Sequence, residues 1–224
     1  MEPHFDDPAI AMAHRSAVRS IERVVTETTP PTPDAKEKIL EQLGNPKTLI
    51  ITGAGISTDS GIPDYRSKNG RLTKGRPMTF QEFAHSPAQV HRYWARAFVG
   101  MRFMRQAQPN RAHFALVELE QAGLIRGIVT QNVDGLHQAA GSHPVIDLHG
   151  RLDRVRCQQC DALSSRAALH ARMLAMNPEL AARLPELAAD AAQAPDGDAE
   201  VDRTSSFRYP PCPLCGGILK PDVV

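Results

Sequence analysis

Short apolar runs alternate with helix-like stretches along this chain, and their order predicts an α/β fold. Three runs have the length and β-branched content of buried strands, and they cover residues 48–52, 124–130 and 145–149. Helices are predicted at residues 34–43, 77–103 and 112–122. Asp34 near an N-cap and Gly44 as a stop bound the first helix, and Gly123 ends the last. Strands that alternate with helices are typical of a doubly wound parallel sheet.

Polar motifs follow each of the three predicted strands. In chain order they are Gly53-Ala54-Gly55, Gln131-Asn132-Val133-Asp134 and His149. Ligands of doubly wound sheets bind beyond the carboxyl ends of the strands, which meet at one edge. We therefore expect these three motifs to form a single site.

The first motif has the composition of a phosphate-binding turn. Glycines let backbone N–H groups approach an anion, and the N-terminus of a following helix favours its charge. The usual dinucleotide fingerprint is absent, because its third glycine would fall at Thr58 and its acidic partner at Thr73. Two interpretations stay open on this evidence, an anion-binding turn and a tight turn without a ligand.

All four cysteines occur in Cys-x-x-Cys pairs, at Cys157/Cys160 and Cys212/Cys215. Two such pairs complete a tetrahedral sulfur site for one structural zinc ion, with no open position for catalysis. The 51 residues between the pairs exceed the usual spacing. Disulfides and a redox pair are the alternatives. Disulfides are not favoured without a secretion signal, and a duplicated redox pair would be unusual. We expect zinc.

Composition and charge exclude some classes of function. The formal net charge of +1 argues against nucleic-acid binding through a strong positive field. No apolar run is long enough to cross a bilayer. Residues 1–7 are acidic where a signal peptide needs a basic start. Residues 12–25 hold three arginines and resemble a mitochondrial presequence, but Glu22 counts against it. We expect a cytoplasmic protein.

The chain divides at changes in composition. Residues 26–33 form a proline-rich linker that cannot be helical throughout. Residues 161–202 are alanine-rich, and helix is expected between residues 165 and 192, in pieces because Pro178 and Pro185 interrupt it. Nothing in this stretch suggests chemistry. The aromatic residues between positions 77 and 103 are expected to pack on a core for the most part.

Four motifs in order resemble the sirtuins, a family of NAD-consuming protein lysine deacylases. They are GAGIS with SGIPDYR at residues 53–66, TQNVDGLH at 130–137, LHG at 148–150, and the two cysteine pairs. Together they cover residues 48–224. Residues 92–96, 108–110 and 194–198 are similar to the class II branch, which includes a mitochondrial sirtuin.

The resemblance implies a fold and a domain organisation. It implies a Rossmann-like domain at residues 34–150, after an N-terminal extension and linker at 1–33. A small inserted zinc-ribbon module follows at 151–219, and residues 220–224 are expected to begin a strand that returns to the parallel sheet. Full-length sirtuins continue from here with further strands and NAD-binding loops, so we expect an apolar edge and face of the sheet to be exposed.

The resemblance also implies a reaction, in which NAD is a co-substrate and the partner is an acylated lysine of a protein. The acyl oxygen displaces nicotinamide, and the acyl group leaves as O-acyl-ADP-ribose. His149 matches the general base, a role suited to imidazole near neutral pH. The expected NAD-binding residues are Gly53, Ala54, Gly55, Ser57, Gly61, Ile62, Pro63, Asp64, Tyr65, Arg66, Gln131, Asn132, Val133 and Asp134.

Among these, Asn132 and Asp134 are expected to hold the nicotinamide pocket and the ribose. Asp64, Tyr65 and Arg66 match the loop that covers NAD. Three histidines without a motif-based role, His113, His137 and His170, are expected to face solvent or to pack.

Two questions stay open. Tyr93 and Arg96 are similar to a pair that binds acidic acyl groups in one sirtuin branch, although Arg96 also suits a helix surface. The competing functions are an NAD-dependent deacylase, a zinc-stabilised binding module that does not turn over, and a protein ADP-ribosyltransferase. The residues do not define the acyl group, the protein targets or the oligomeric state.

Overall fold

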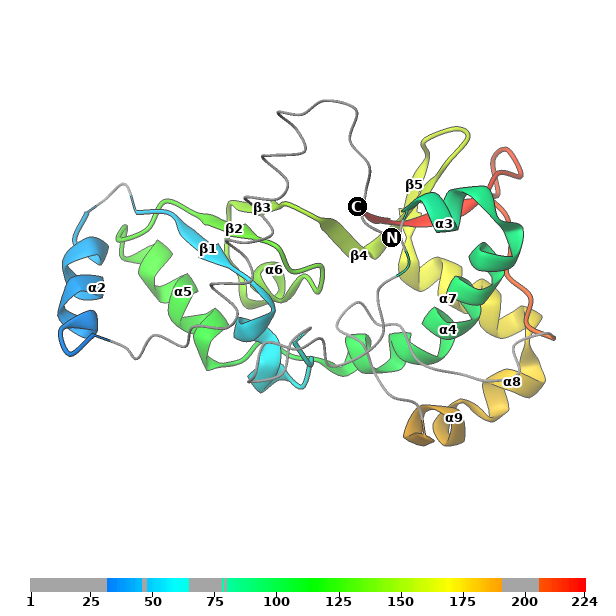
Figure 1. The fold of residues 1–224 in the computed structure, drawn as a ribbon, viewed down its shortest axis with the longest axis horizontal. Helices are drawn as coiled ribbons and strands as arrows, with labels where there is room; N and C mark the ends of the chain where they lie inside the picture. Colours follow the sequence, from blue (N-terminus) through cyan, green and yellow to red (C-terminus); the bar gives the residue numbers. More distant parts are fainter. Residues whose placement is uncertain (1–31, 46–47, 65–77, 79, 191–205) are drawn as a thin grey trace, which may run out of the picture.

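The computed structural model describes residues 32–45, 48–64, 78, 80–190 and 206–224. The described part forms an elongated molecule with a parallel sheet at one end and an antiparallel sheet at the other (Figure 1). Residues 1–31 of the predicted N-terminal extension and linker, Tyr65, Arg66 and the loop at 194–198 lie outside the described residues. In the described part, no helix is long and apolar enough to span a bilayer.

The parallel sheet contains the three strands that the sequence predicts, each three residues long. They are β1 (Ile50–Thr52), β2 (Ile128–Thr130) and β3 (Val145–Asp147), in the order β1-β2-β3. Thr52 aligns with Thr130, and Thr130 aligns with Asp147. All three strands therefore end at the same level, which confirms the predicted common edge.

Helices α2 (Ala35–Leu43), α5 (Arg111–Gln121) and α6 (Leu136–Ala140) lie around this sheet, and the first two match predicted helical stretches. Asp34 is the N-cap residue of α2 without capping it through its side chain, and Gly44 ends the helix. The side chain of Asn110 does cap α5, where it accepts a hydrogen bond from the backbone N–H of Ala112 at 2.9 Å. Helices α5 and α6 contact each other.

The face of the sheet that points away from His137 of α6 is open in the described part of the chain. Ile51 and Ile146 lie in one row of this face, and their exposed fractions are 69% and 57%. On the opposite face, Thr52 and Thr130 are buried. The prediction that residues 48–52 form a fully buried strand is therefore wrong for Ile51, and the doubly wound arrangement is seen on one face alone among the described residues.

The antiparallel sheet has the order β5-β4-β6, with β4 (Gly150–Cys157) between β5 (Leu163–Ser165) and β6 (Leu219–Val223). This pairing corrects the expectation that residues 220–224 begin a strand of the parallel sheet. Lys220 pairs with Arg156 of β4 instead. Asp222 adds ion pairs across the same two strands, to Arg154 at 3.1 Å and to Arg156 at 2.9 Å. Both the strand pairing and the ion pairs therefore join β6 to β4.

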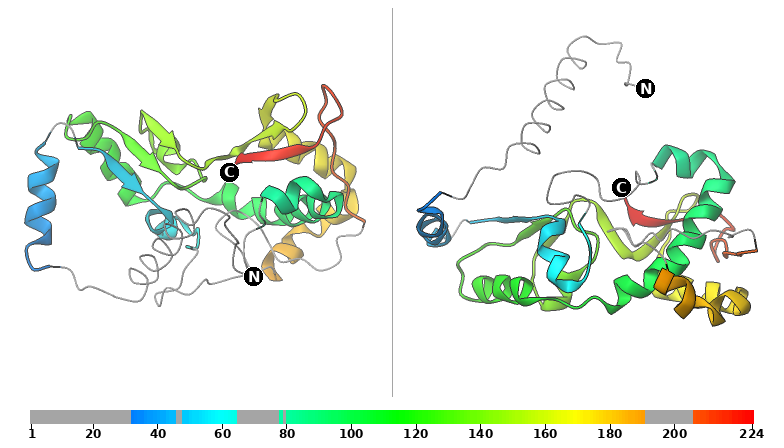
Figure 2. Two further views of the ribbon diagram at one scale, coloured as in Figure 1. Left: turned by 45° about the horizontal axis from the view of Figure 1, so that its top comes forward. Right: turned by 60° about the horizontal axis from the view of Figure 1, so that its bottom comes forward.

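Helices cover the antiparallel sheet and form the main core with it (Figure 2). They are α3 (Phe80–His85), α4 (Pro87–Gln106), α7 (Arg166–Met176), α8 (Pro178–Ala182) and α9 (Leu184–Asp190). The helices are interrupted at Asn177 and Arg183, and Pro178 and Pro185 lie in the first turns of α8 and α9, close to the predicted breaks. Proline suits a first helical turn, where its missing N–H has no intrahelical partner.

The core around Trp94 ties α4 to the zinc side of the molecule. Trp94 and Phe98 have no exposed surface, and they share a cluster with Val155, Met173 and Leu219 among others. The indole Nε1–H of Trp94 donates to the backbone carbonyl of Leu219 at 2.9 Å. Residues 80–99, which the sequence assigned to the Rossmann-like domain, therefore pack mainly with the zinc module.

A smaller apolar cluster joins the two ends of the molecule. It contains Ile62 after the first turn, Met104 of α4, Leu136 of α6 and Leu152 of β4. Because these residues come from both ends, their contacts fix the parallel sheet relative to the antiparallel one.

Gly150 occupies the joint between the two sheets, and we expect replacement by alanine to lower the free energy of unfolding by about 3 kcal/mol or more. Its φ angle is +78°, and a Cβ atom there would overlap the backbone oxygen of Asp222. Strand β6 would therefore have to move. Urea unfolding of Gly150→Ala checks this, with Gly53→Ala as a matched control, because φ at Gly53 is −136° and a Cβ atom added there would have no atom within 4 Å. Equal losses in both variants would contradict the steric argument.

Candidate active site and metal centre

Backbone hydrogen bonds bring the three polar motifs to one edge of the parallel sheet. The N–H of Gln131 donates to the carbonyl of Thr52 at 3.0 Å, and the N–H of Leu148 donates to that of Thr130 at 2.9 Å. Each bond joins the segment after one strand to the end of its neighbour. The expected convergence of the glycine turn, residues 131–134 and His149 is therefore confirmed.

The glycine turn continues into η1, a 3-10 helix at Ala54–Ser60, and not into an α-helix. Gly53 is extended, and Gly61 ends the turn with φ +83°, a value that favours glycine. Asn110, at the start of α5, holds η1 in place. Its Nδ2 donates to the carbonyl of Ile56 at 2.7 Å and to Ser60 Oγ at 3.0 Å. Sequence reasoning gave Asn110 no role in the site.

Ser57, Asn132 and Asp134 form a connected polar group at the sheet edge. Ser57 Oγ donates to Asp134 Oδ2 at 2.7 Å, and Asn132 Nδ2 donates to Ser57 Oγ at 3.1 Å. Ser57 is fully buried and Asn132 is 9% exposed. Asp134 Oδ1 also accepts the N–H of Leu136 at 2.9 Å, which fixes the carboxylate against the start of α6. Burial and mutual bonding hold these three side chains in defined positions.

His149 lies at the same edge with an exposed side chain. Its Nδ1 contacts the backbone carbonyl of Gln131 at 2.9 Å. Because a carbonyl can only accept, Nδ1 must carry the proton of the neutral ring, and Nε2 is then an unprotonated acceptor. The imidazole is thus oriented by one nitrogen and able to take a proton with the other.

The remaining predicted residues fall into two groups. Ile62 is buried in the small apolar cluster, and Val133 packs against that cluster, so both support the site through packing. Pro63 and Asp64 are half-buried at the end of the described segment. Roles for Ala54, Gly55, Pro63 and Asp64 in NAD binding stay predictions.

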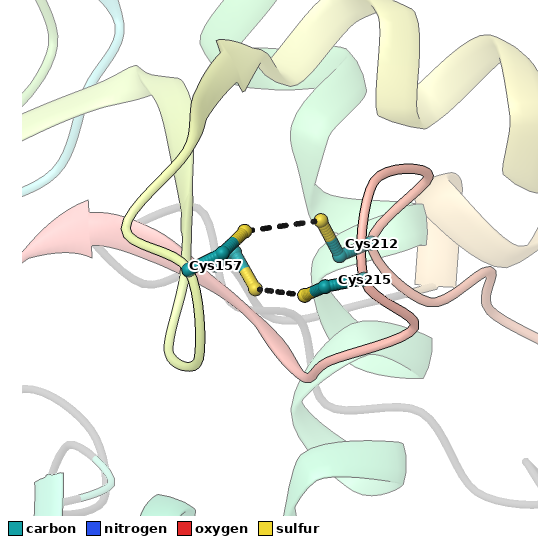
Figure 3. A group of neighbouring side chains, drawn as sticks. Cys157, Cys212 and Cys215 are labelled. Carbon is teal, nitrogen blue, oxygen red and sulfur yellow. Dashed lines mark hydrogen bonds between the residues drawn. The ribbon is translucent and has the colours of Figure 1, made fainter.

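The four cysteines converge on one point, which the sequence predicts. Their sulfur atoms lie within 4.8 Å of one another, with Cys157 and Cys215 at 3.5 Å and Cys160 and Cys212 at 3.8 Å (Figure 3). Tetrahedral zinc with Zn–S bonds of about 2.3 Å places sulfur atoms about 3.8 Å apart. The cluster is therefore suited to one structural zinc ion, and the sulfur separations are too long for disulfide bonds.

Backbone N–H groups favour the thiolate form at one of the four cysteines. Those of Cys160 and Gln159 point at the sulfur of Cys157 and lower the pKa of its thiol to about 6. At Cys215 the N–H of Gly217 acts in the same direction, but the neighbouring sulfur atoms outweigh it and raise the pKa of that thiol to about 12. Cys157 and Cys212 are also buried in the main core. The metal centre and the packing around Trp94 therefore form one structural unit.

Three histidines that the sequence placed in solvent or in packing positions are all buried. The exposed fractions of His113, His137 and His170 are 0%, 1% and 6%. His113 and His137 lie close to the Ser57–Asp134 group, with their ring centroids 4.9 Å apart. A histidine at a helix position that faces the sheet is expected to be buried, so the sequence could have indicated burial for these rings. It could not indicate that two of them lie side by side, because that depends on the contact between α5 and α6.

Fold and site together define the class of protein: a Rossmann-like α/β protein with a polar site at its strand ends and a four-cysteine metal centre. The Sir2 family model matches residues 53–224, and the chain belongs to the Sir2, or sirtuin, family. It is 52% identical over 194 residues to NAD-dependent protein deacetylase 1 of Corynebacterium efficiens, a match that covers 85% of this chain and 68% of that protein.

Further relatives agree with this assignment. The NAD-dependent protein deacetylase of Xanthomonas axonopodis pv. citri is 50% identical over 80% of this chain and 59% of its own. A solved complex described as Sir2-p53 peptide-NAD+ is 28% identical with a TM-score of 0.58, covering 84% of this chain and 63% of that one. A Sir2 homolog-NAD complex is 32% identical with a TM-score of 0.55, over 89% and 64%. The chain thus spans about three fifths to two thirds of the length of these relatives.

Proposed function

We propose that this chain carries out NAD-dependent removal of acetyl groups from lysine side chains of proteins. The observation that carries the proposal is the geometry of His149, whose Nδ1 donates to Gln131 and whose Nε2 is left to accept a proton. This general base lies at the sheet edge that also holds Ser57, Asn132 and Asp134. Relatives at 50–52% identity bear the name NAD-dependent protein deacetylase.

The polar group at the strand ends has the chemistry to hold a nucleotide co-substrate. NAD supplies the ADP-ribose that accepts the acyl group as nicotinamide leaves. Asn132 can present its side-chain carbonyl to the carboxamide, because its Nδ2 is already bonded to Ser57. Asp134, held by Ser57 and by the N–H of Leu136, presents a fixed carboxylate near the ribose. Gly53, Ala54 and Gly55 are assigned to the diphosphate.

In this proposal His149 Nε2 takes the proton of a ribose hydroxyl, and the resulting oxygen attacks the carbon of the activated acyl group. The positive charge that develops on the ring is compensated by the hydrogen bond from Nδ1–H to the Gln131 carbonyl. The lysine amine then leaves and one water adds to the acyl carbon, so that NAD, acyl-lysine and water give nicotinamide, free lysine and O-acyl-ADP-ribose.

Incubating the purified chain with NAD and an acetyl-lysine peptide tests the proposal. We expect nicotinamide and deacetylated peptide to appear in equal amounts, and neither to appear when one substrate is left out. Deacetylation without nicotinamide release, or no reaction at all, would contradict it. Transfer of ADP-ribose to protein would support the transferase alternative, and NAD binding without turnover would support the binding module.

The class II assignment and a preference for acidic acyl groups form a further part of the proposal. Tyr93 lies in contact with Phe83 and Trp94 and hydrogen-bonds to the buried guanidinium of Arg166, so its position is fixed by the core. Arg96, one turn along α4, is half-buried. The test is to measure the rates of wild type and Arg96→Ala on succinyl-, glutaryl-, lipoyl- and acetyl-lysine peptides. An unchanged rate of the variant on every acidic substrate would rule out Arg96 as the specificity residue.

A further inference from the structure

Two buried histidines face each other beneath the polar group of the site. His113 lies in the first turn of α5 and His137 in α6, and both rings are almost completely shielded from solvent. Their centroids are 4.9 Å apart and their planes are inclined by 57°. The proposed reaction leaves both imidazoles without a role.

Each of these rings uses one nitrogen and leaves the other without a partner. His113 Nδ1 accepts the backbone N–H of Asn110 at 3.3 Å, so the proton of the neutral ring is on Nε2. His137 Nε2 contacts Thr52 Oγ1 at 2.9 Å, and the Thr52 hydroxyl donates to Thr130 Oγ1 at 2.8 Å. Thr52 Oγ1 therefore accepts from His137, whose proton is on Nε2.

The two nitrogens that remain are complementary. His113 Nε2 is a donor and His137 Nδ1 is an acceptor, and both atoms are buried without a hydrogen-bond partner among the described residues. Buried polar atoms in folded proteins are almost always paired. In the structure these two atoms are not bonded to each other, although their rings are neighbours. We propose that in solution the rings turn so that His113 Nε2–H donates a hydrogen bond to His137 Nδ1, and that this neutral pair is a positioning element of the NAD site.

The pair would close a ring of hydrogen bonds that starts and ends on η1. On one side, Asn110 connects His113 to η1 through its bonds to Ile56 and Ser60. On the other side, the ring continues from His137 through Thr52 to Thr130.

The ring returns to η1 through Asn132. Its backbone N–H donates to Thr130 Oγ1 at 3.1 Å, and its Nδ2 donates to Ser57 Oγ at 3.1 Å. The histidine pair thus connects α5 and α6 to Asn132 and, through Ser57, to Asp134, the two side chains that orient the proposed co-substrate. The pair itself does not contact the co-substrate.

Burial favours the neutral form of both rings and outweighs the nearby carboxylates. Burial lowers the pKa of both histidines, and the proximity of His113 lowers that of His137 further. Asp134 opposes the shift at both rings, and Asp147 opposes it at His137. Because the folded-state pKa values are lowered, the neutral rings stabilise the folded protein at pH values above the unfolded pKa near 6.5. This contribution is lost as the pH falls below that value.

Nitrogen NMR of the imidazoles in the full chain, without ligand, tests the hydrogen bond directly. At neutral pH we expect both rings as Nε2–H tautomers, a slowly exchanging His113 Nε2–H, and scalar coupling from its nitrogen to His137 Nδ1. His143, whose side chain is exposed, serves as the reference ring. A His137 ring protonated on Nδ1, or no coupling between the two rings, would overturn the proposal. This test does not depend on catalysis.

The positioning role, which rests on the proposed function, is tested by NAD affinity in matched variants. Gln at position 113 can keep a donor where Nε2–H lies, whereas Leu of similar volume cannot. We expect His113→Leu to weaken NAD binding at least tenfold, and His113→Gln and the control His143→Gln to change it less than threefold. Equal effects of Leu and Gln would overturn the donor role. If wild type binds no NAD, the proposed function fails while the NMR result still stands.

Discussion

Removing zinc from the four-cysteine centre will unfold the half of the molecule built around the antiparallel sheet. Cys157 and Cys212 belong both to the metal centre and to the core that contains Trp94 and Leu219. Losing the ion therefore leaves close-packed thiolates inside an apolar core and frees the loops that carry them. Structural zinc binds with an apparent free energy of about 10–16 kcal/mol in small zinc domains at pH 7, and this energy is coupled to folding.

We expect one zinc ion per chain by metal analysis, and a Cys157→Ser variant that melts at least roughly 10 °C lower than wild type. The matched control is Gln158→Ala, because Gln158 is an exposed neighbour on the same loop. Limited proteolysis of the metal-free protein should cut first within residues 150–224. An unchanged melting temperature after complete zinc removal would contradict this account of the core.

Replacing His149 by alanine is expected to lower kcat for deacetylation by about 100-fold or more, the range typical of a lost general base. The side chain is exposed, and its one described hydrogen bond is to the Gln131 carbonyl, which water can replace. We therefore expect the melting temperature and the affinity for NAD to change little. The effect should appear in kcat and not in KM.

His143→Ala provides the control for this experiment, since His143 is exposed and lies away from the polar group at the strand ends. Turnover and melting temperature are compared for the three proteins under the same conditions. A loss of less than threefold in His149→Ala would show that another group takes the proton.

The sequence predicted the site well where a general rule of topology applied. Parallel strands end at one edge, so the order of motifs after residues 52, 130 and 147 was enough to bring Ser57, Asn132 and His149 together. The cysteine pairs were equally clear, because their spacing within each pair fits one metal ion.

The features that were missed depend on contacts between distant segments. The bond from Asn110 to η1 joins residues more than fifty positions apart, and nothing local in the sequence marks it. Strand β6 was assigned to the wrong sheet because an apolar strand carries no information about its partner. The separate prediction that residues 48–52 are buried failed at Ile51, since a β-branched run predicts a strand and not what covers it, whereas the expectation of an exposed apolar face of the sheet agrees with Ile51 and Ile146.

Finally, His149 is fastened to both sheets at once. The residue before it, Leu148, donates its N–H to the end of β2. The backbone carbonyl of His149 accepts the N–H of Val224, just beyond β6, at 3.1 Å. The next residue, Gly150, begins β4. A small rotation of one sheet against the other would therefore displace the imidazole relative to Asn132 and Asp134. The position of the proposed base therefore depends on the orientation of the two halves of the molecule, and we expect even a distant change in the zinc-side half to alter turnover.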